Sequence, residues 1–225
     1  MVKEPEVNNN SQPFDSLAIG NFTMSQSLQT QMSFEQFLEW KPETSRYELH
    51  HGVAIEMQPT GRHEEITGFL ALELALEFRR LNLPYFCPKQ ALVKSLNRDS
   101  AYCPDVLVVN RNALSTEPLW ERHSTLTRGI SIPLAIEVVS TNWRDDYLTK
   151  LRDYEELEIP EYWIVDYLAL GGTRYIGTPK QATISIYDLA EGEYRVRQFR
   201  GSDRLKSPSF PELELTANSV FGTDL

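Results

Sequence analysis

The clearest periodic pattern in the chain is a stretch of helical spacing between residues 63 and 80. Six apolar residues recur on or beside one face of it: Ile66, Phe69, Leu70, Leu74, Leu76 and Phe78. Because residues three or four positions apart share a helix face, this spacing predicts a long amphipathic helix. Its apolar side is expected to cover a core.

Local signals indicate two further helices. The sequence Ser-Phe-Glu-Gln at 33–36 fits a capping box, which is typical of the first turn of a helix. Phe34, Phe37 and Leu38 then share one face, so a short helix is expected from Ser33. Another helix is expected at about 145–157. Its apolar stripe would be Tyr147, Leu151 and Tyr154.

Runs rich in β-branched and aromatic residues predict strands at about 85–94, 102–109, 133–140 and 161–166. Two β-hairpins are also expected, because paired strand runs flank glycine-containing turns. They join 47–49 to 53–57 around Gly52, and 183–189 to 194–199 around Gly192. The polar stretch 110–132 is expected to be a mobile loop.

These elements predict an α/β fold with a mixed β-sheet flanked by helices. Residues 31–225 are expected to form a single domain, because a chain of 225 residues can bury one large core. Residues 1–30 are rich in Asn, Gln, Ser and Thr and show no sustained periodicity. A flexible N-terminal arm is therefore expected there.

Composition narrows the class of protein. Hydrophobic residues make up 41% of the chain and charged residues 24%, as in soluble globular proteins. No run approaches the roughly 18 apolar residues that a membrane span needs, and no secretion signal is visible, so a cytoplasmic protein is expected. Cys87 and Cys103 lack the spacing of a metal site or a disulfide framework and are expected to be reduced core residues.

The formal net charge is −10, from 22 basic and 32 acidic residues. Because phosphates bind basic surfaces, this charge argues against broad nonspecific affinity for nucleic acid. A nucleic-acid substrate would need a local basic patch, or a metal that screens the acids.

Two carboxylates stand where strand sequences are otherwise apolar. Glu137 interrupts the run 133–140, which is typical of a strand covered on both faces. Asp105 follows Pro104 and opens the apolar run 106–109. Because an unpartnered buried carboxylate is strongly destabilising, each should meet a cation, a metal or strong hydrogen-bond donors.

Oxygen ligands that converge from two strands suit a hard divalent cation such as Mg²⁺ or Mn²⁺. Water on such a cation is a usable nucleophile near neutral pH, and the cation neutralises charge on a phosphate. The pattern therefore favours hydrolysis of a phosphodiester. Lys150, which follows Glu137 on the next helix at the edge of its apolar stripe, is the candidate assisting cation.

Six short segments of the chain, taken in sequence order, resemble the Uma-type restriction endonuclease family. More broadly, they resemble the PD-(D/E)XK nuclease superfamily. They are Arg46-Tyr47-Glu48-Leu49 with Gly52, His63, Pro104-Asp105-Val106, Ile136-Glu137-Val138-Val139-Ser140, Asp146-x-x-x-Lys150 and Pro160–Asp166. The resemblance runs from about residue 31 to the C-terminus. It implies a restriction-endonuclease-like core, dependence on a divalent metal, and DNA as the substrate.

The resemblance also implies roles for particular residues. Asp105 and Glu137 would be metal ligands, Lys150 the catalytic lysine and Glu48 an accessory acid, with His63 as a further candidate. The superfamily normally places its lysine two residues after the Glu, where this chain has Val139. In the Uma-type family the lysine function lies on the following helix, and Lys150 matches that version.

Each candidate also has a purely structural interpretation. Glu137 could be held in a buried ion pair with Lys150 or an arginine, and Lys150 could pair with Asp146 four residues earlier. Asp105 could cap the start of a strand, and Glu48 could be an ordinary surface acid. His63 could simply be the first residue of its helix.

Other segments are expected to have no role in chemistry. Where family members often carry Asp-Gly, the sequence His50-His51-Gly52 is taken as turn variation. Glu161 and Asp166 are expected to face solvent or to join salt bridges. Tyr162 and Trp163 between them are expected in the core.

Five basic residues cluster near the C-terminus: Arg195, Arg197, Arg200, Arg204 and Lys206. They could follow DNA phosphates, but a charged edge hairpin that prevents sheet-to-sheet aggregation is the preferred interpretation. Arg62, Lys89 and Lys94 lie closer in sequence to the candidate site.

The sequence thus predicts a divalent-metal-dependent endonuclease acting on DNA, with Mg²⁺ or Mn²⁺ held by Asp105 and Glu137 and with Lys150 assisting. Two alternatives are a catalytically silent interaction module that kept the nuclease fold, and a hydrolase of small phosphate esters. A homodimer is expected if both DNA strands are cut, because that commonly requires two sites. No membrane association is expected.

Overall fold

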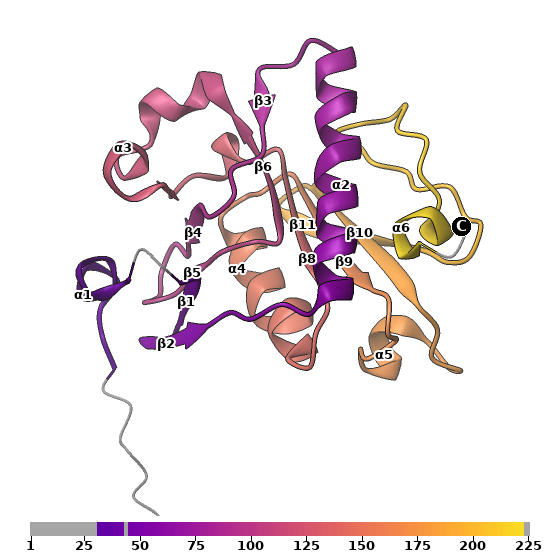
Figure 1. Cartoon of the computed structure of the whole chain (residues 1–225), viewed down its shortest axis with the longest axis horizontal. Helices are drawn as coiled ribbons and strands as arrows, with labels where there is room; N and C mark the ends of the chain where they lie inside the picture. The colour runs from indigo at the N-terminus through magenta and orange to yellow at the C-terminus, as the bar shows by residue number, and fades with distance from the viewer. Residues whose placement is uncertain (1–30, 43–44, 223–225) are drawn as a thin grey trace, which may run out of the picture.

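The computed structural model describes residues 31–42 and 45–222, so the expected arm at 1–30 lies outside the described residues. Two sheets with covering helices form the expected α/β arrangement (Figure 1). One sheet contains β1 (Tyr47–His50), β2 (Val53–Glu56), β4 (Leu92–Lys94), β5 (Ala101–Tyr102) and β7 (Thr125–Leu126). The other contains β3 (Tyr85–Phe86), β6 (Val106–Asn110), β8 (Leu134–Val138), β9 (Glu161–Asp166), β10 (Thr183–Ala190) and β11 (Glu193–Phe199).

Both sheets are mixed. The five-stranded sheet has the order β2-β1-β5-β4-β7 and the six-stranded sheet the order β11-β10-β9-β8-β6-β3. Strands β4 and β7 are parallel in the first, and β8 and β9 in the second. The predicted mixed sheet flanked by helices is therefore confirmed, with a second sheet that the sequence pattern did not indicate.

Helix α2 (Gly61–Arg80) confirms the long helix predicted from spacing. The side chain of Thr60 caps its start by accepting the backbone N–H of His63. Four residues of the predicted face are buried: Ile66, Leu70, Leu74 and Phe78. Leu76, however, is 51% exposed. It lies two residues, or about 200° of rotation, beyond Leu74, so its assignment to the buried face is wrong.

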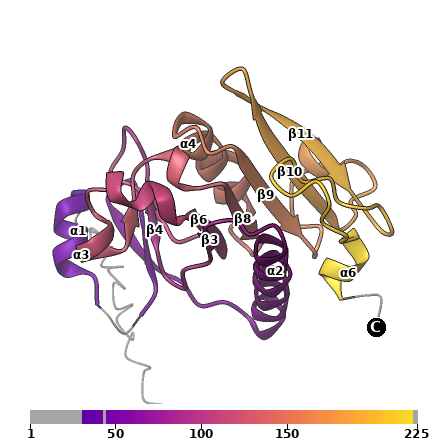
Figure 2. The ribbon, with the colours of Figure 1, turned by 90° about the horizontal axis from the view of Figure 1, so that it is seen from above.

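The six-stranded sheet is covered on both sides (Figure 2), by α2 on one face and by α4 (Leu151–Glu156) on the other. In β8, Leu134 and Ile136 pack in the cluster that contains α2, whereas Ala135 packs with Tyr154 of α4. This alternation is the two-residue period of a strand. By the same period, Glu137 faces the α4 side.

The predicted helix at 145–157 is confirmed in two parts. Residues Asp145–Lys150 form a π-helical turn, η3, and α4 continues from it. Tyr147 and Tyr154 of the predicted stripe are buried. Such wide turns occur often at functional sites, because they re-aim the side chains that follow.

The other local predictions from capping and turn signals are also confirmed. Helix α1 (Phe34–Trp40) begins with both halves of the capping box at Ser33 and Gln36. Strands β1 and β2 form the first hairpin, and Gly52 in its turn has φ +83°, a conformation that favours glycine. Strands β10 and β11 form the second hairpin around Gly192.

Two predicted strands are divided between the sheets. The run 85–94 supplies β3 and β4, and the run 102–109 supplies β5 and β6. The chain crosses from one sheet to the other at Cys103-Pro104-Asp105. Because Pro104 has no backbone N–H to donate, it cannot continue a ladder of hydrogen bonds. Asp105 thus lies at the crossing point.

Regular structure occupies 110–132, which was expected to be a mobile loop. It contains η1 (Arg111–Thr116), α3 (Trp120–His123), β7 and η2 (Gly129–Ser131). Buried Glu117, between η1 and α3, is bound to the residues that follow β7. The Glu117 carboxylate accepts hydrogen bonds from the N–H (2.8 Å) and hydroxyl (2.9 Å) of Thr127 and from the N–H of Arg128 (3.2 Å). The expectation is wrong because polar composition does not reveal such internal partners.

Two short helices were not predicted, α5 (Thr173–Ile176) and α6 (Ala217–Phe221). The last of these packs on α2 in the main core. Both cysteines are free thiols, with Cys103 buried and Cys87 half-buried. Among the described residues, no helix combines the length and the apolar character needed to cross a bilayer.

Glu161 and Asp166 at the two ends of β9 are fully buried, so the expectation that they face solvent is wrong. Tyr162 and Trp163 lie in the core as expected. The Glu161 carboxylate accepts hydrogen bonds from the Trp163 indole, from the Ser207 hydroxyl (3.0 Å) and from the Ser209 N–H (2.8 Å). Burial raises the pKa of Glu161, and these hydrogen bonds act against that rise. The carboxylate therefore fastens the C-terminal segment to β9.

Replacing Glu161 with Ala is expected to destabilise the fold. Three donors would lose their acceptor inside the core, at a cost of about 2–4 kcal/mol in the free energy of unfolding. Urea denaturation measures this change. Glu193→Ala, on the exposed strand β11, is the control and should leave the midpoint nearly unchanged. Equal midpoints for the two variants would contradict this role of Glu161.

Candidate active site

Asp105 and Glu137 meet because of the register between β6 and β8. These strands are antiparallel, with Val106 opposite Ile136. Continuing the register by one residue sets Asp105 opposite Glu137, and residues so opposed have Cβ atoms about 4.5–5.5 Å apart. Oδ2 of Asp105 also accepts the N–H of Val138 at 2.8 Å. Both carboxylates line the same small hollow.

Lys150 brings its ammonium group to this hollow from η3. Its Nζ lies 3.0 Å from Oε2 of Glu137, 3.2 Å from Oε1 of Glu48 and 3.6 Å from Oδ1 of Asp146. The lysine is only 3% exposed. Two contacts that were weighed as structural alternatives, to Glu137 and to Asp146, are therefore both present.

Glu48 is 1% exposed, so its interpretation as a surface acid is wrong. Its Oε1 accepts the N–H of Cys103 at 2.9 Å, and its Oε2 lies 2.7 Å from Nε2 of His50. His50, taken from sequence as turn variation, is thus a partner of Glu48. The signal for it was the spacing of two residues, which puts both side chains on one face of β1.

Asp105 has two basic neighbours. Nε2 of His63 lies 3.1 Å from Oδ2 of Asp105 and 3.1 Å from the carbonyl oxygen of Val138. Nη2 of Arg46 lies 3.6 Å from Oδ1 of Asp105 and donates to the carbonyls of Cys103 (2.7 Å) and Pro104 (3.0 Å). The crossing segment is therefore fixed from both sides of Asp105.

The site carries more negative than positive charge. Burial raises the pKa of Glu137 well above its ordinary value, despite the opposing charge of Lys150, and repulsion from Asp105 adds to the rise. Burial likewise raises the pKa of Asp146 to about 7. For Glu48, burial is outweighed by Lys150 and by the His50 hydrogen bond, which lower its pKa to about 2.

Lys150 keeps its proton. Burial alone would lower its pKa, but the charges of Glu137, Glu48 and Asp146 outweigh this and raise the pKa well above the ordinary value. Glu137 has one further partner, the hydroxyl of Tyr154, which donates to its Oε1 at 2.8 Å. Tyr154 was assigned from sequence only to the apolar stripe, and nothing in that pattern indicated this contact.

The hollow at the acids is small, about 40 Å³, and Glu48, His63, Asp105, Glu137 and Lys150 are all in its walls. All of the site residues predicted from the sequence therefore lie around the same hollow. Asp146 and His50 line it too. A larger hollow of about 330 Å³ adjoins it and shares His63 and Asp105 as walls.

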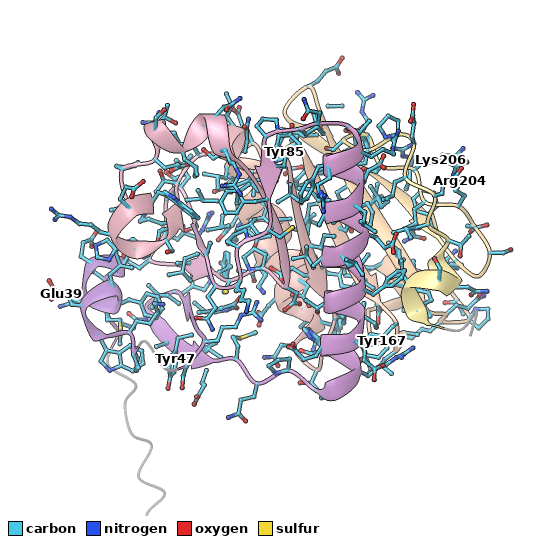
Figure 3. All side chains as sticks on the ribbon, turned by 45° about the horizontal axis from the view of Figure 1, so that its top comes forward. Glu39, Tyr47, Tyr85, Tyr167, Arg204 and Lys206 are labelled. Carbon is cyan, nitrogen blue, oxygen red and sulfur yellow. The ribbon has the colours of Figure 1, made fainter. Side chains whose placement is uncertain are left out.

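Of the five C-terminal basic residues, Arg200 lines a hollow near the site, whereas the other four lie elsewhere. Arg195 and Arg197 are exposed on β11, which is the edge strand of its sheet, and Arg204 lies 3.4 Å from Glu214. Figure 3 shows Arg204 and Lys206 at the opposite edge of the molecule from Tyr47 of β1. This placement fits the preferred interpretation of a charged edge hairpin.

The carboxylate oxygens around the hollow are the type of ligand that a hard divalent cation prefers. Five carboxylates line the hollow with one lysine: those of Glu48, Asp105, Glu137, Asp145 and Asp146. The pKa values of Glu137 and Asp146 are raised chiefly by burial and further by repulsion from neighbouring acids, and a bound cation would oppose both effects. Among the described residues, however, no three His, Cys, Asp or Glu side chains already stand in a metal-binding arrangement. A cation on Glu137 would compete with the amine of Lys150.

A solved structure with a similar fold supports the α/β architecture described above. A solved structure described as "a putative nuclease belonging to DUF820" from Anabaena variabilis ATCC 29413 has a TM-score of 0.65 to this chain. The two sequences are 17% identical, and the match covers 86% of this chain and 99% of that chain, so the likeness concerns the fold. No curated protein matches the chain.

Residues 34–218 match the model of the Uma2 family, which carries the description "Putative restriction endonuclease". The matched range contains the acids, the lysine and both histidines of the site. Because it takes in well over half of the 225 residues, the chain belongs to the Uma2 family.

Proposed function

We propose that this protein is a divalent-metal-dependent endonuclease that hydrolyses phosphodiester bonds of DNA. The observation that carries the proposal is the convergence of Glu48, Asp105, Glu137 and Asp146 with buried Lys150 around one hollow. Acids of this kind rarely gather in a core without a functional reason, because each must be desolvated. Membership of the Uma2 family supports the nuclease assignment.

Asp105 and Glu137 are the proposed ligands of Mg²⁺ or Mn²⁺. When bound, such a cation lowers the pKa of water and neutralises charge that develops on a phosphate. The chain's own contribution is to hold the ligands in place. The Val138 N–H and His63 orient Asp105, and the Tyr154 hydroxyl orients Glu137.

Lys150 is proposed to act as a cation and not as a base. Because its pKa is raised, its amine stays protonated near neutral pH and cannot accept a proton from water. An ammonium group beside the scissile phosphate would stabilise the negative charge of the transition state. Glu48 is proposed to hold this ammonium group in place, since its Oε1 lies 3.2 Å from Nζ.

One observation favours the alternative of a catalytically silent module. Lys150 already contacts the proposed ligand Glu137 at 3.0 Å, so the acids are partly neutralised by the protein itself. In such a module the ion pair would be purely structural. The two functions differ in their response to divalent metal, and both predictions below use that difference.

Replacing either proposed ligand with its amide should abolish cleavage. For Asp105→Asn and Glu137→Gln we expect Mn²⁺-dependent nicking of supercoiled plasmid to fall by about a thousandfold or more, because several kcal/mol of transition-state stabilisation is lost. The amides keep the side-chain shape, and the amide carbonyl introduced at position 105 can still accept the Val138 N–H. Circular dichroism checks that each variant is folded.

Glu193→Gln on the exposed strand β11 is the matched control and should nick at the wild-type rate. The enzyme proposal fails if the wild-type protein cuts no DNA with any divalent metal. The assignment of ligands fails if the two amide variants cut as fast as the control.

Replacing Lys150 with Met should separate a metal site from a structural ion pair. The variant leaves buried carboxylates without their cation, so we expect a loss of about 3–5 kcal/mol in the free energy of unfolding without metal. Mn²⁺ should restore a large part of this loss by taking the place of the ammonium group. Thermal denaturation with and without Mn²⁺ measures both effects.

Wild-type protein should gain less from Mn²⁺ than Lys150→Met, because its own lysine competes for Glu137. A Lys150→Met variant whose melting temperature does not respond to Mn²⁺ would favour the silent module.

A further inference from the structure

Two hollows that share wall residues lie beside the acids, at the end of β9. The hollow of about 330 Å³ beside Asp105 and His63 has apolar walls that include Tyr167 and Leu168. A second hollow of about 480 Å³ shares these two residues. We call the two hollows together the Tyr167 groove. Figure 3 shows Tyr167 beside the N-terminal end of α2, at the other end of that helix from Tyr85.

The far end of the Tyr167 groove is positively charged. Arg62 and Arg200 both line the second hollow. Arg200 donates to the Thr183 hydroxyl (2.9 Å) and to the carbonyl of Ile176 (3.0 Å), which are neutral acceptors. Its guanidinium also donates to Oε1 of Gln198 at 2.8 Å, and it forms no ion pair with a carboxylate within residues 31–42 and 45–222, although Asp203 accepts its backbone N–H at 2.9 Å. Arg62 has Glu65 as an ion-pair partner.

The segment that divides the two hollows is held rigidly. Oδ1 and Oδ2 of Asp166 accept the N–H groups of Leu170 (2.9 Å) and Gly171 (2.8 Å). A Cβ at Gly171 would lie 2.9 Å from the Asp166 carboxylate, so the turn requires glycine. Leu168 is 55% exposed on this turn, beside half-buried Tyr167. Asp166 thus positions an exposed apolar and aromatic surface beside the acids.

We propose that the Tyr167 groove binds a single-stranded segment of DNA, an inference that rests on the proposed function. The scissile phosphate lies at Asp105 and Glu137. A neighbouring base packs on Tyr167 and Leu168, and the next phosphate meets Arg62 and Arg200. Asp166 is a positioning residue for this surface.

Single-stranded DNA fits the groove better than a duplex. A base inside a duplex is stacked on both faces, so it cannot pack on a tyrosine ring in a hollow unless it is first extruded. Duplex binding also depends on many phosphate contacts, which a chain of net charge −10 does not offer here. Three arginines line the groove, and one of them, Arg46, is already bound to Asp105 and to two backbone carbonyls. Stacking on an aromatic side chain adds affinity without further basic residues.

Fluorescence anisotropy tests the proposal with a labelled oligonucleotide of about 12 nucleotides, single-stranded or annealed to its complement. Ca²⁺ replaces Mg²⁺, since it takes the same oxygen ligands, and a gel checks that the strand stays intact. The single strand should bind more tightly than the duplex. Tyr167→Leu should weaken its binding about tenfold, whereas Tyr167→Phe, which keeps the ring, should stay within about twofold of wild type.

The charged end has its own matched pair of variants. Arg200→Gln should weaken binding of the single strand and reduce its dependence on salt. Arg195→Gln removes an arginine from exposed β11, outside the groove, and should bind as wild type does.

Equal or tighter binding of the duplex would overturn the proposal, and so would unchanged binding by Tyr167→Leu. Either result in a protein that still cuts DNA would leave the proposed function standing. Conversely, a protein that binds the single strand through Tyr167 and Arg200 but cuts nothing with any divalent metal would support the groove and refute the nuclease.

Discussion

The contact between the Lys150 ammonium group and the buried carboxylates is the interaction on which the site depends. Nζ lies 3.0 Å from Glu137 and 3.2 Å from Glu48, in surroundings that exclude water almost completely. Without a cation there, the acids would take up protons or destabilise the fold. Lys150 therefore offsets part of the cost of burying these acids, although the pKa of Glu137 stays raised beside it.

The cation comes from a helix because a buried apolar residue occupies the strand position where the superfamily normally has its lysine. Two residues after Glu137, Val139 is fully buried on the same face, in the cluster that also contains Tyr147. The π-helical turn η3 then carries Lys150 back over the end of β8. Asp105 reaches the same point because Pro104 ends one strand and directs the chain into the other sheet. The site thus depends on how the two sheets meet.

Whether a feature could be predicted from the sequence depends on how far apart along the chain the interacting residues lie. Helix α2, the two hairpins and the buried strand β8 were predictable, because their signals lie within a few residues. The division of 102–109 between two sheets was not, because it depends on which distant strands pair. Burial of Glu48 follows from that same crossing, since Cys103 donates to it. The candidate residues were found by type and order, whereas their contacts required the register of β6 on β8.

Anomalous diffraction from crystals of this protein soaked in Mn²⁺ tests the central claim most directly. The account predicts one peak in the hollow at about 2 Å from carboxylate oxygens of Asp105 and Glu137. It also predicts that Nζ of Lys150 has moved away from Glu137 to make room. The account would be contradicted if the hollow showed no peak at saturating Mn²⁺ and Lys150 remained in contact with Glu137.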